Sequence, residues 1–195
     1  MSVRFSTTTS DFLQWADMTN LVRNLFDDGK PTLSLLVACG CFFGLRISDL
    51  LSVRWSQLLN QDSFDITEKK TGKRRTIRIN AQLQKHIKAC HKVIAPASLN
   101  TACFISQKNT VYSIQRLNTI LKELKYSYRL NIDNISTHTL RKTFGRRVYE
   151  QAGTNSEHAL VMLSEIFNHS TTTITRKYLG IKEQDIFQIY DSLAF

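Results

Sequence analysis

Proline and glycine are scarce in this chain, and their scarcity constrains the fold more than any other feature of the sequence. The 195 residues include two prolines, Pro31 and Pro96, and seven glycines. Because proline breaks a helix interior and glycine destabilises one, the sequence favours long helices joined by short connections. The length suits one domain, and a hydrophobic fraction of 42% is enough to bury a core. We therefore expect residues 1–195 to form a single, mainly helical domain.

Apolar residues recur at helical spacing in most segments of the chain. Near the N-terminus the pattern is formed by Phe12, Trp15, Met18, Leu21 and Leu25. Similar patterns predict helices over TLSLLVACGCFF, AQLQKHIKACHKVI, YSIQRLNTILKELKYSY, STHTLRKTFGRRVYEQAG, EHALVMLSEIF and TTITRKYL. In YSIQRLNTILKELKYSY we expect one face to carry Ile114, Leu117, Ile120, Leu121 and Leu124.

Capping residues precede two of the predicted helices. We expect Ser48 or Asp49 to cap the helix that follows the sequence GLR. For the helix of STHTLRKTFGRRVYEQAG, we expect Ser136 or Thr137 as the cap and Gly153 as the stop.

One stretch between the helices has an alternating apolar pattern instead. In FDITEKKTGKRRTIRIN, Phe64 and Ile66 alternate on one arm, and Ile77 and Ile79 alternate on the other. The basic sequence KKTGKRR lies between the arms, so the stretch predicts a β-hairpin with a basic tip. The expected fold class is therefore α+β, mainly α with a small antiparallel sheet or hairpin.

The charge of the chain indicates an anionic partner. It contains 26 Lys and Arg residues against 16 Asp and Glu, which gives a formal net charge of +10. Double-stranded DNA is the first candidate for such a partner. The apolar runs are all shorter than a membrane span, and the four cysteines form no C-x-x-C pair. We therefore expect a cytoplasmic protein, associated with the nucleoid when on DNA, whose cysteines are small buried hydrophobes.

Six residues suited to phosphate or acid–base chemistry stand at the boundaries of predicted elements. Singly, each has a structural explanation, such as a solvated surface cation, a helix-cap histidine or a core tyrosine. Their order along the chain, R…K…H-x-x-R…H…Y with a step of nine positions between the last two, is much more specific. They are Arg46, Lys70, His138, Arg141, His169 and Tyr178.

This ordered set resembles the tyrosine recombinases, also called the phage integrase family. GLRISDLL is similar to the family's first-arginine box, and KKTGKRRTIRI to its catalytic hairpin. THTLRKTFGRRVYEQAG resembles the H-x-x-R helix, and SEIFNHSTTTITRKYLGI resembles the closing box. The step of 31 residues from His138 to His169 is several residues longer than usual. We expect the extra residues in GTNSEHALVML, as a loop and the start of a helix.

The resemblance implies an enzyme that breaks and rejoins DNA strands through a covalent 3′-phosphotyrosine. Tyr178 would be the nucleophile, and Arg46 and Arg141 would hold the non-bridging phosphate oxygens. The resemblance implies the fold of the family's catalytic domain for the whole chain. We expect no metal and no other cofactor, because cationic side chains take the place that a metal would occupy.

The remaining three residues would handle protons and the phosphate. Lys70 would protonate the leaving 5′-oxygen, and His138 would assist proton transfer at the tyrosine. His169 would donate a hydrogen bond to the phosphate. Further basic side chains are expected to contact the DNA backbone, namely Lys69, Lys73, Arg74, Arg75, Lys142, Arg146, Arg147, Arg176 and Lys177.

The C-terminal sequence KEQDIFQIYDSLAF has one apolar helical face. Ile186, Ile189, Tyr190 and Leu193 are spaced by three and four residues, and Phe187 and Phe195 widen the face. We expect a helix over about residues 182–193. We expect this helix to dock either onto its own domain or, as the resemblance favours, onto the next protomer. We expect a monomer in free solution and a tetramer on DNA.

Several alternatives stay open at this point. The family's N-terminal core-binding domain has no counterpart in the residues before Arg46, so the chain is either a catalytic-domain fragment or a short recombinase. Two rival functions are strand relaxation like that of a type IB topoisomerase, and DNA binding by a non-catalytic regulator. The DNA target, the accessory proteins and the choice among integration, excision and inversion are open as well.

Overall fold

The computed structural model describes residues 10–181 and 190–193. In chain order its elements are α1 (Trp15–Asp27), α2 (Pro31–Phe43), α3 (Ile47–Leu50), α4 (Trp55–Leu58), β1 (Ser63–Thr67), β2 (Arg74–Arg78), α5 (Ala81–Ile94), α6 (Ile114–Ser127), α7 (Thr137–Ala152), the 3₁₀ turn η1 (Gly153–Asn155), α8 (Ser156–Phe167) and α9 (Thr172–Leu179). The expected mainly helical fold with one small antiparallel sheet is confirmed. Within the described part of the chain, no helix has the length and apolarity that crossing a membrane requires.

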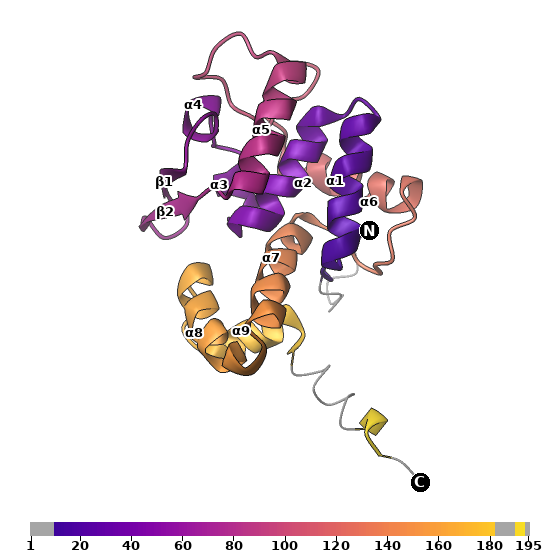
Figure 1. Ribbon diagram of the computed structural model, residues 1–195, viewed down its shortest axis with the longest axis vertical. Coiled ribbons are helices and arrows are strands. Elements are labelled where there is room, and N and C mark those ends of the chain that lie inside the picture. Colours follow the sequence, from indigo (N-terminus) through magenta and orange to yellow (C-terminus); the bar gives the residue numbers. More distant parts are fainter. Residues whose placement is uncertain (1–9, 182–189, 194–195) are drawn as a thin grey trace.

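Helix α2 is the centre of the main core. Nine of its 13 residues are buried, so this apolar helix packs against neighbours on most of its sides. Figure 1 shows α1 and α5 on either side of α2, with α7 running from this group down to α8 and α9. The neighbours α1 and α5 cover α2 with Met18, Leu21, Leu25, Leu83, Ile87 and Cys90. All four cysteines are buried thiols, as expected.

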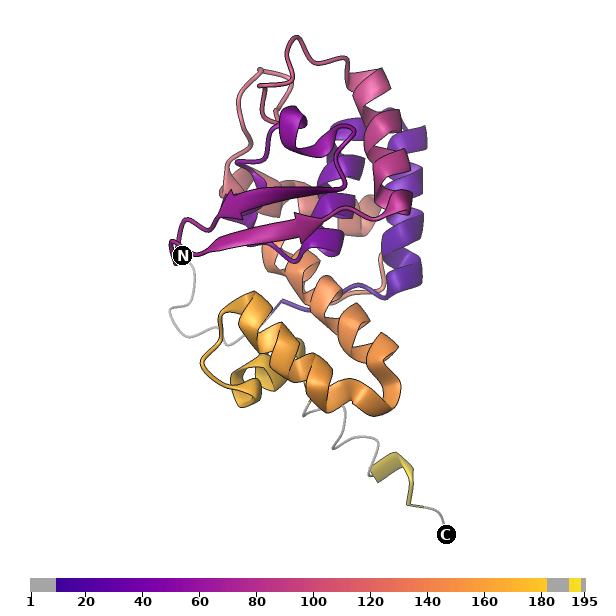
Figure 2. The ribbon, with the colours of Figure 1, turned by 60° about the vertical axis from the view of Figure 1, so that its left-hand side comes forward.

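The predicted hairpin is confirmed as the antiparallel pair β1–β2. Phe64 lies opposite Ile77, and Ile66 lies opposite Arg75. Because side chains alternate along a strand, the apolar residues share the inner face, where Phe64 meets the ring of Phe43 at 5.3 Å between centroids. Figure 2 shows the hairpin lying over the helical layer, above the α8–α9 pair. The basic turn therefore extends toward the side of the molecule formed by α8.

A second, smaller core joins α7, α8 and α9. It consists of Leu160, Leu163, Phe167, Leu179 and Ile181. Helix α8 ends because Asn168 adopts the left-handed conformation, with φ of 53°. Helix α9 begins after Thr171, whose hydroxyl accepts the N–H of Ile174. This packing places the segment from His169 to Tyr178 against α7.

The cap prediction for α7 is confirmed, and the one for α3 is wrong. The hydroxyl of Ser136 accepts the N–H of His138 at 3.1 Å, and Gly153 ends the helix. Helix α3 is a single turn that starts at Ile47, so Ser48 and Asp49 lie inside it and Arg46 occupies the cap position. The prediction was wrong because the helix begins one residue before Ser48, directly after Arg46. The Arg46 guanidinium does not cap the helix, since groups from other elements hold it.

Two further expectations have mixed outcomes. The long step between the two histidines is accommodated by η1 and the start of α8, which agrees with the predicted loop and helix start. On α6, Leu117, Ile120, Leu121 and Leu124 face the core. Ile114, expected on the same face, is 39% exposed because it lies at the first residue of the helix, beyond the edge of the core.

Gly44 joins α2 to Arg46, and we expect Gly44→Ala to destabilise the protein. Its φ is 59°, and an added Cβ would lie 2.4 Å from the ring of Phe144. The left-handed conformation costs an alanine about 1–2 kcal/mol, and overpacking costs about 1–3 kcal/mol more. Gly29→Ala is the control, since its φ is 71° but its Cβ would meet nothing within 4 Å among the described residues. Denaturant unfolding should show a larger loss for Gly44→Ala, and equal losses would contradict the packing argument.

Candidate active site

A cavity of about 380 Å³ brings all six predicted residues together. It lies where the segment before α3, the hairpin turn, the start of α7 and the α8–α9 connection meet. The other lining residues are Leu45, Ile47, Ser48, Thr137, Phe167 and Asn168. The six are Arg46, Lys70, His138, Arg141, His169 and Tyr178. Six residues that lie up to 132 positions apart in the sequence, from Arg46 to Tyr178, therefore line one cavity.

The two arginines of the cavity converge on one backbone carbonyl. Arg46 Nη2 donates to the Phe167 carbonyl at 3.2 Å, and Arg141 Nη2 donates to the same oxygen at 3.0 Å. Arg141 Nη1 also donates to the Gly44 carbonyl at 2.8 Å. Phe167 is the last residue of α8, where carbonyls lack partners within the helix and the helix dipole is negative. The C-terminus of α8 therefore orients both guanidinium groups.

Arg141 is the more deeply held of the two. It is 5% exposed, and its guanidinium carbon lies 4.4 Å from the centroid of the Phe167 ring. Burial lowers the pKa of Arg141 to about 10, so the group is still charged at neutral pH. A cation in this position can bind a phosphate oxygen with little water in competition.

Glu68 and Arg75 belong to the same network, and the sequence reasoning missed this role for both. The Glu68 carboxylate accepts Arg46 Nη1 at 2.6 Å and Arg75 Nη1 at 2.9 Å. Arg75 Nη1 also donates to the Ile166 carbonyl at 3.0 Å. The alternating pattern of the strand could have identified Glu68, because Phe64, Ile66 and Glu68 occupy alternate positions and so face the same, inner side of the hairpin. A charged residue on the inner face of a strand needs a partner there.

Tyr178 lies in the cavity with its hydroxyl buried. The hydroxyl oxygen has no hydrogen-bond partner among the described residues. Its ring packs edge-on against His169 at 5.3 Å and against Phe167 at 5.5 Å between centroids. Burial raises the pKa of Tyr178, and the charges of Arg141 and Arg46 counteract part of that rise. The phenol is therefore protonated at neutral pH, and a base must take its proton before it can attack.

The two histidines of the cavity are neutral at neutral pH. His169 Nδ1 lies 3.0 Å from the Thr175 hydroxyl, and Thr175 in turn pairs with Ser164 at 2.8 Å. Burial lowers the pKa of His169, and Arg141 and Arg46 lower it further. Burial also lowers the pKa of His138, with added effects of Lys142 and Arg141. A neutral imidazole can accept a proton or donate its single N–H.

Lys70 projects from the hairpin turn at the edge of the cavity. Its side chain is exposed to solvent and lines the cavity. The turn itself is braced from the core, because the buried carboxylate of Asp49 accepts the N–H of Lys69 at 2.9 Å. Asp49 thus supports the hairpin turn and caps no helix.

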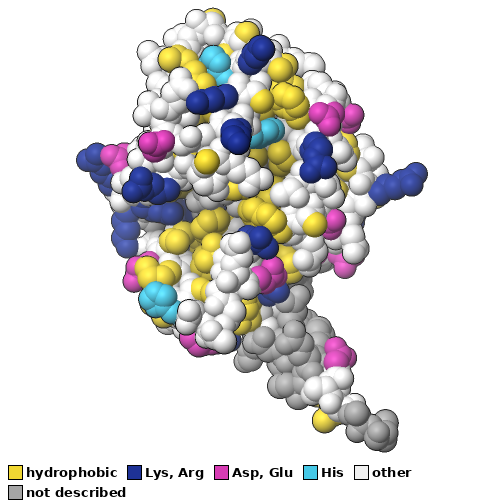
Figure 3. Space-filling model, in the orientation of Figure 1, with side chains coloured by type: hydrophobic (Ala, Val, Ile, Leu, Met, Phe, Trp, Pro, Cys, Tyr) yellow, Lys and Arg dark blue, Asp and Glu magenta, His cyan; other side chains and the backbone are white. Residues whose placement is uncertain are grey.

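The nine further basic residues fall into different environments. Figure 3 shows Lys and Arg side chains gathered at the left of this face, over the hairpin. Lys69, Lys73, Arg74 and Lys177 are exposed. Arg147 stacks on the Trp15 ring, and Arg176 pairs with Glu157.

Packing argues against three residues of that set as DNA contacts. Lys142 is 8% exposed and donates to the Ser10 carbonyl, with its ammonium 5.2 Å from the Tyr178 ring centroid. Arg146 is 8% exposed and pairs with Glu150. Arg75 is held by Glu68, as described above. Contacts with groups distant in sequence also hold these three side chains in the fold, namely the Ile166 carbonyl for Arg75, the Ser10 carbonyl for Lys142 and the Phe12 ring for Arg146.

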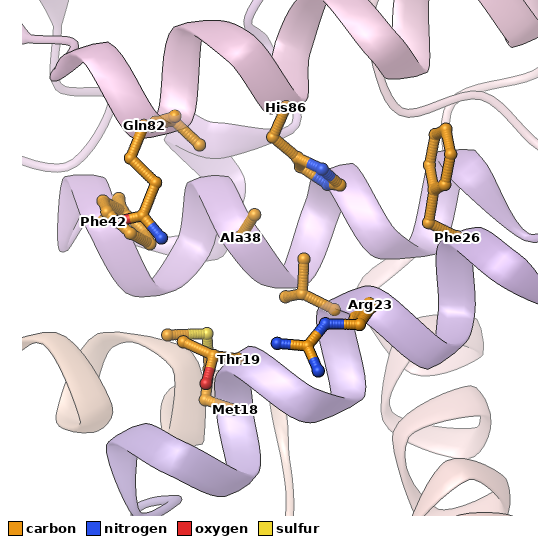
Figure 4. Close-up of a pocket in the computed structure, with 10 residues that line it drawn as sticks. Met18, Thr19, Arg23, Phe26, Ala38, Phe42, Gln82 and His86 are labelled. Carbon is orange, nitrogen blue, oxygen red and sulfur yellow. The ribbon is translucent and has the colours of Figure 1, made fainter.

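A second cavity, of about 260 Å³, lies between α1, α2 and α5. Figure 4 shows its lining, which includes Met18, Phe26, Phe42 and His86. His86 is held there by the Ser34 hydroxyl at 3.0 Å. The described residues contain no group of three or more His, Cys, Asp or Glu that could hold a metal ion. The second cavity therefore contains none of the six candidate residues that line the first.

Comparisons with known proteins give one consistent family for this chain. A family model described as the phage integrase family matches residues 21–185. A curated relative, the probable integrase/recombinase YoeC of Bacillus subtilis, is 36% identical over 141 residues, which are 71% of this chain and 72% of that protein. A probable integrase/recombinase of Acholeplasma phage L2 is 30% identical over 148 residues, and the chain spans 48% of its length.

A solved structure of similar fold is the Tn1549 transposon integrase in complex with transposon right end DNA. It aligns with a TM-score of 0.68 and 16% identity, over 95% of this chain and 68% of the other. At this identity the likeness shows a shared fold.

Proposed function

Since this chain belongs to the phage integrase family of site-specific recombinases, we propose that it cleaves and rejoins DNA through a covalent 3′-phosphotyrosine at Tyr178. One observation carries the assignment of the residue. The Tyr178 hydroxyl is buried and unpaired among the described residues, in a cavity that also holds Arg46 and Arg141. A buried polar group without a partner is uncommon and suits an atom whose partner is a substrate.

The proposed reaction balances its bonds and protons within the cavity. Tyr178 Oη attacks the scissile phosphorus and forms an O–P bond, while the bond from phosphorus to the 5′-oxygen breaks. His138 takes the phenol proton, and Lys70 gives a proton to the departing 5′-oxygen. The reverse attack by a 5′-hydroxyl restores the phosphodiester, so the energy of the broken bond is retained.

The arginines and His169 would act on the non-bridging oxygens. As the phosphorus becomes pentacoordinate, charge concentrates on these oxygens, and fixed cationic donors stabilise it. Arg46 and Arg141 are already oriented by the Phe167 carbonyl, so little reorganisation is needed on binding. His169, oriented by Thr175, supplies a neutral donor.

Double-stranded DNA is the partner that the family and the charge support. The exposed cations around the cavity, Lys69, Lys73, Arg74 and Lys177, are our proposed backbone contacts. We propose the described residues as one catalytic domain. We also propose that the protein acts in the cytoplasm, where it is associated with the nucleoid, because its partner is DNA.

A nicked suicide substrate tests the proposed reaction. The duplex carries a nick close to the cleavage site, so the short 5′ fragment diffuses away and the covalent intermediate accumulates. The wild-type protein should form a denaturation-resistant protein–DNA adduct. A non-catalytic regulator would bind the duplex and form none. The integrase and recombinase relatives do not favour the topoisomerase alternative, which predicts relaxation of a supercoiled plasmid without strand exchange.

We propose that the protein is a monomer in free solution and a tetramer on DNA, with the C-terminal tail docked on the next protomer. Ile186, Phe187, Ile189 and Phe195 lie outside the described residues. In the described part of the tail, Tyr190 is 68% exposed and Leu193 is 73% exposed, which supports docking onto another surface. A short helix is marginal in water unless its apolar face is covered.

Deletion of residues 182–195 is expected to separate cleavage from recombination. The truncated protein should form the covalent adduct on the suicide substrate, because the described cavity residues all precede the deletion. It should lose complete recombination and the tetramer on DNA, as measured by gel mobility and light scattering. Recombination at the wild-type rate would show that the tail only packs on its own domain.

A further inference from the structure

Glu68 is a buried carboxylate at the point where strand β1 passes into the basic turn. It is 1% exposed, and it accepts hydrogen bonds from Arg46, Arg75 and Thr71 at 2.6, 2.9 and 2.9 Å. Its backbone closes the turn, since its N–H donates to the Lys73 carbonyl at 3.0 Å. Two donors from the hairpin itself and one from the segment before α3 therefore meet on one carboxylate.

Glu68 is ionised at neutral pH despite its burial. Burial by itself would raise the pKa of the carboxyl, but the hydrogen bonds from Arg75, Thr71 and Arg46 outweigh it and lower the pKa below its usual value. A buried charge is tolerated only where paired and hydrogen-bonded, and Glu68 meets both conditions.

The Arg46 guanidinium is held between two acceptors on different elements. Nη1 donates to Glu68 on the hairpin, and Nη2 donates to the Phe167 carbonyl at the end of α8. These two bonds use two of the five guanidinium N–H groups, and the remaining three are available to the cavity that Arg46 lines. Two fixed acceptors define the plane of a guanidinium, whereas one leaves it free to rotate.

Arg75 secures Glu68 from the other side. The same Nη1 atom that contacts Glu68 also donates to the Ile166 carbonyl, one residue before Phe167. The hairpin is thereby tied to the C-terminus of α8 twice, once through Arg46 and once through Arg75. The tie through Arg46 passes through the carboxylate of Glu68, and the same carboxylate also binds the Arg75 side chain that makes the other tie.

We propose that Glu68 is a positioning residue for strand cleavage, whose carboxylate fixes the orientation in which Arg46 meets the scissile phosphate. The inference rests on the proposed function of the cavity. A negative charge near a phosphate opposes binding, so the contribution of Glu68 is to the geometry of Arg46 and not to the attraction of DNA. Removing the charge should therefore slow cleavage while DNA affinity stays the same or rises.

Glu68→Gln tests the proposal, because glutamine keeps the size of the side chain and loses the charge. Single-turnover cleavage of the suicide substrate should slow by roughly 10- to 100-fold, since a misplacement of about 1 Å can cost about 10²-fold. DNA affinity should stay within about twofold or increase. Asp65→Asn is the matched control, because Asp65 pairs with Arg74 at 2.6 Å on the same hairpin but in an exposed position. This control should cleave at the wild-type rate.

A double-mutant cycle identifies the residue through which Glu68 acts. In an Arg46→Ala background, Glu68→Gln should cause no further loss of cleavage, because the group that it orients is gone. Additive losses would overturn the proposal, as they indicate a general structural role. Wild-type cleavage by the single variant would overturn it as well.

The alternative is that Glu68 affects cleavage through Lys70 in the hairpin turn and not through Arg46. A modified substrate distinguishes these two cases. Glu68 contacts Thr71, which is next to Lys70 in the turn. Lys70 is the proposed proton donor to the leaving group, and the thiolate leaving group of a 5′-bridging phosphorothiolate substrate departs without a proton. This substrate should rescue Lys70→Ala and should not rescue Glu68→Gln. Rescue of both would mean that Glu68 acts through Lys70, against the proposal.

Separate controls distinguish misfolding of the variant from failure of the proposed function. If Glu68→Gln does not fold, Glu68→Asp keeps the charge and shortens its reach, and the same slower cleavage, retained affinity and absence of rescue are expected for it. An absence of adduct from the wild-type protein would instead refute the proposed function. Wild-type adduct with unaffected Glu68 variants would refute the positioning role alone.

Discussion

Tyr178→Phe is expected to bind DNA with wild-type affinity and to form no covalent adduct on the nicked suicide substrate. The substitution removes only the Oη atom, which is the proposed nucleophile. The ring contacts to His169 and Phe167, and the Lys142 ammonium over the ring, are available to phenylalanine as well. Adduct formation should therefore be lost completely, and DNA affinity should be unchanged.

The stability of the same variant provides an independent check on the site. The Tyr178 hydroxyl is buried and unpaired among the described residues, and such a group costs about 1–3 kcal/mol of folding free energy. Tyr178→Phe should therefore be as stable as the wild type or slightly more stable in thermal unfolding. Tyr126→Phe, at a residue that is 76% exposed on α6, should leave adduct formation unchanged. An undiminished adduct in Tyr178→Phe would assign the nucleophile to another residue.

Arg141→Ala is expected to reduce the rate of cleavage by at least about 10²–10³-fold, the size of effect that follows loss of one electrostatic donor to a transition state. Arg141→Lys should restore little of the cleavage rate, although it keeps the charge, because an ammonium lacks the planar fork of N–H donors of a guanidinium. Arg46→Ala should show a similar loss of cleavage. Arg116→Ala, in an exposed ion pair with Glu123 on α6, is the control and should cleave normally.

The two arginine variants should differ in stability. Arg141 is 5% exposed and donates to the Gly44 and Phe167 carbonyls, so its loss leaves two buried acceptors without that donor. The side chain of Arg46 is 22% exposed, and Arg75 still neutralises Glu68 when Arg46 is absent. Thermal unfolding should therefore show a larger decrease for Arg141→Ala. Cleavage within a few-fold of wild type in a folded Arg141→Ala protein would contradict the assigned role.

Local patterns in the sequence determined the elements of this fold. Apolar residues at spacings of three and four predicted the long helices, and the period of two around KKTGKRR predicted the hairpin, because both periods follow from backbone geometry alone. The order of the six polar residues was visible in the same way, as a pattern that needs no knowledge of packing. Ser136 and Gly153 marked the ends of α7 through their own backbone and side-chain preferences.

Tertiary structure alone decided which charged residues belong to the site. Arg75, Lys142 and Arg146 looked like neighbours of the exposed cations, yet the Ile166 carbonyl, the Ser10 carbonyl and the Phe12 ring hold them within the fold. Glu68 itself became important only when Arg46, 22 residues earlier, and the end of α8 were packed against the hairpin. The acceptor that orients both arginines of the cavity is a backbone carbonyl, at Phe167, which every residue type possesses. A long-range contact to such a group has no signature in the sequence, because packing and not residue identity creates it.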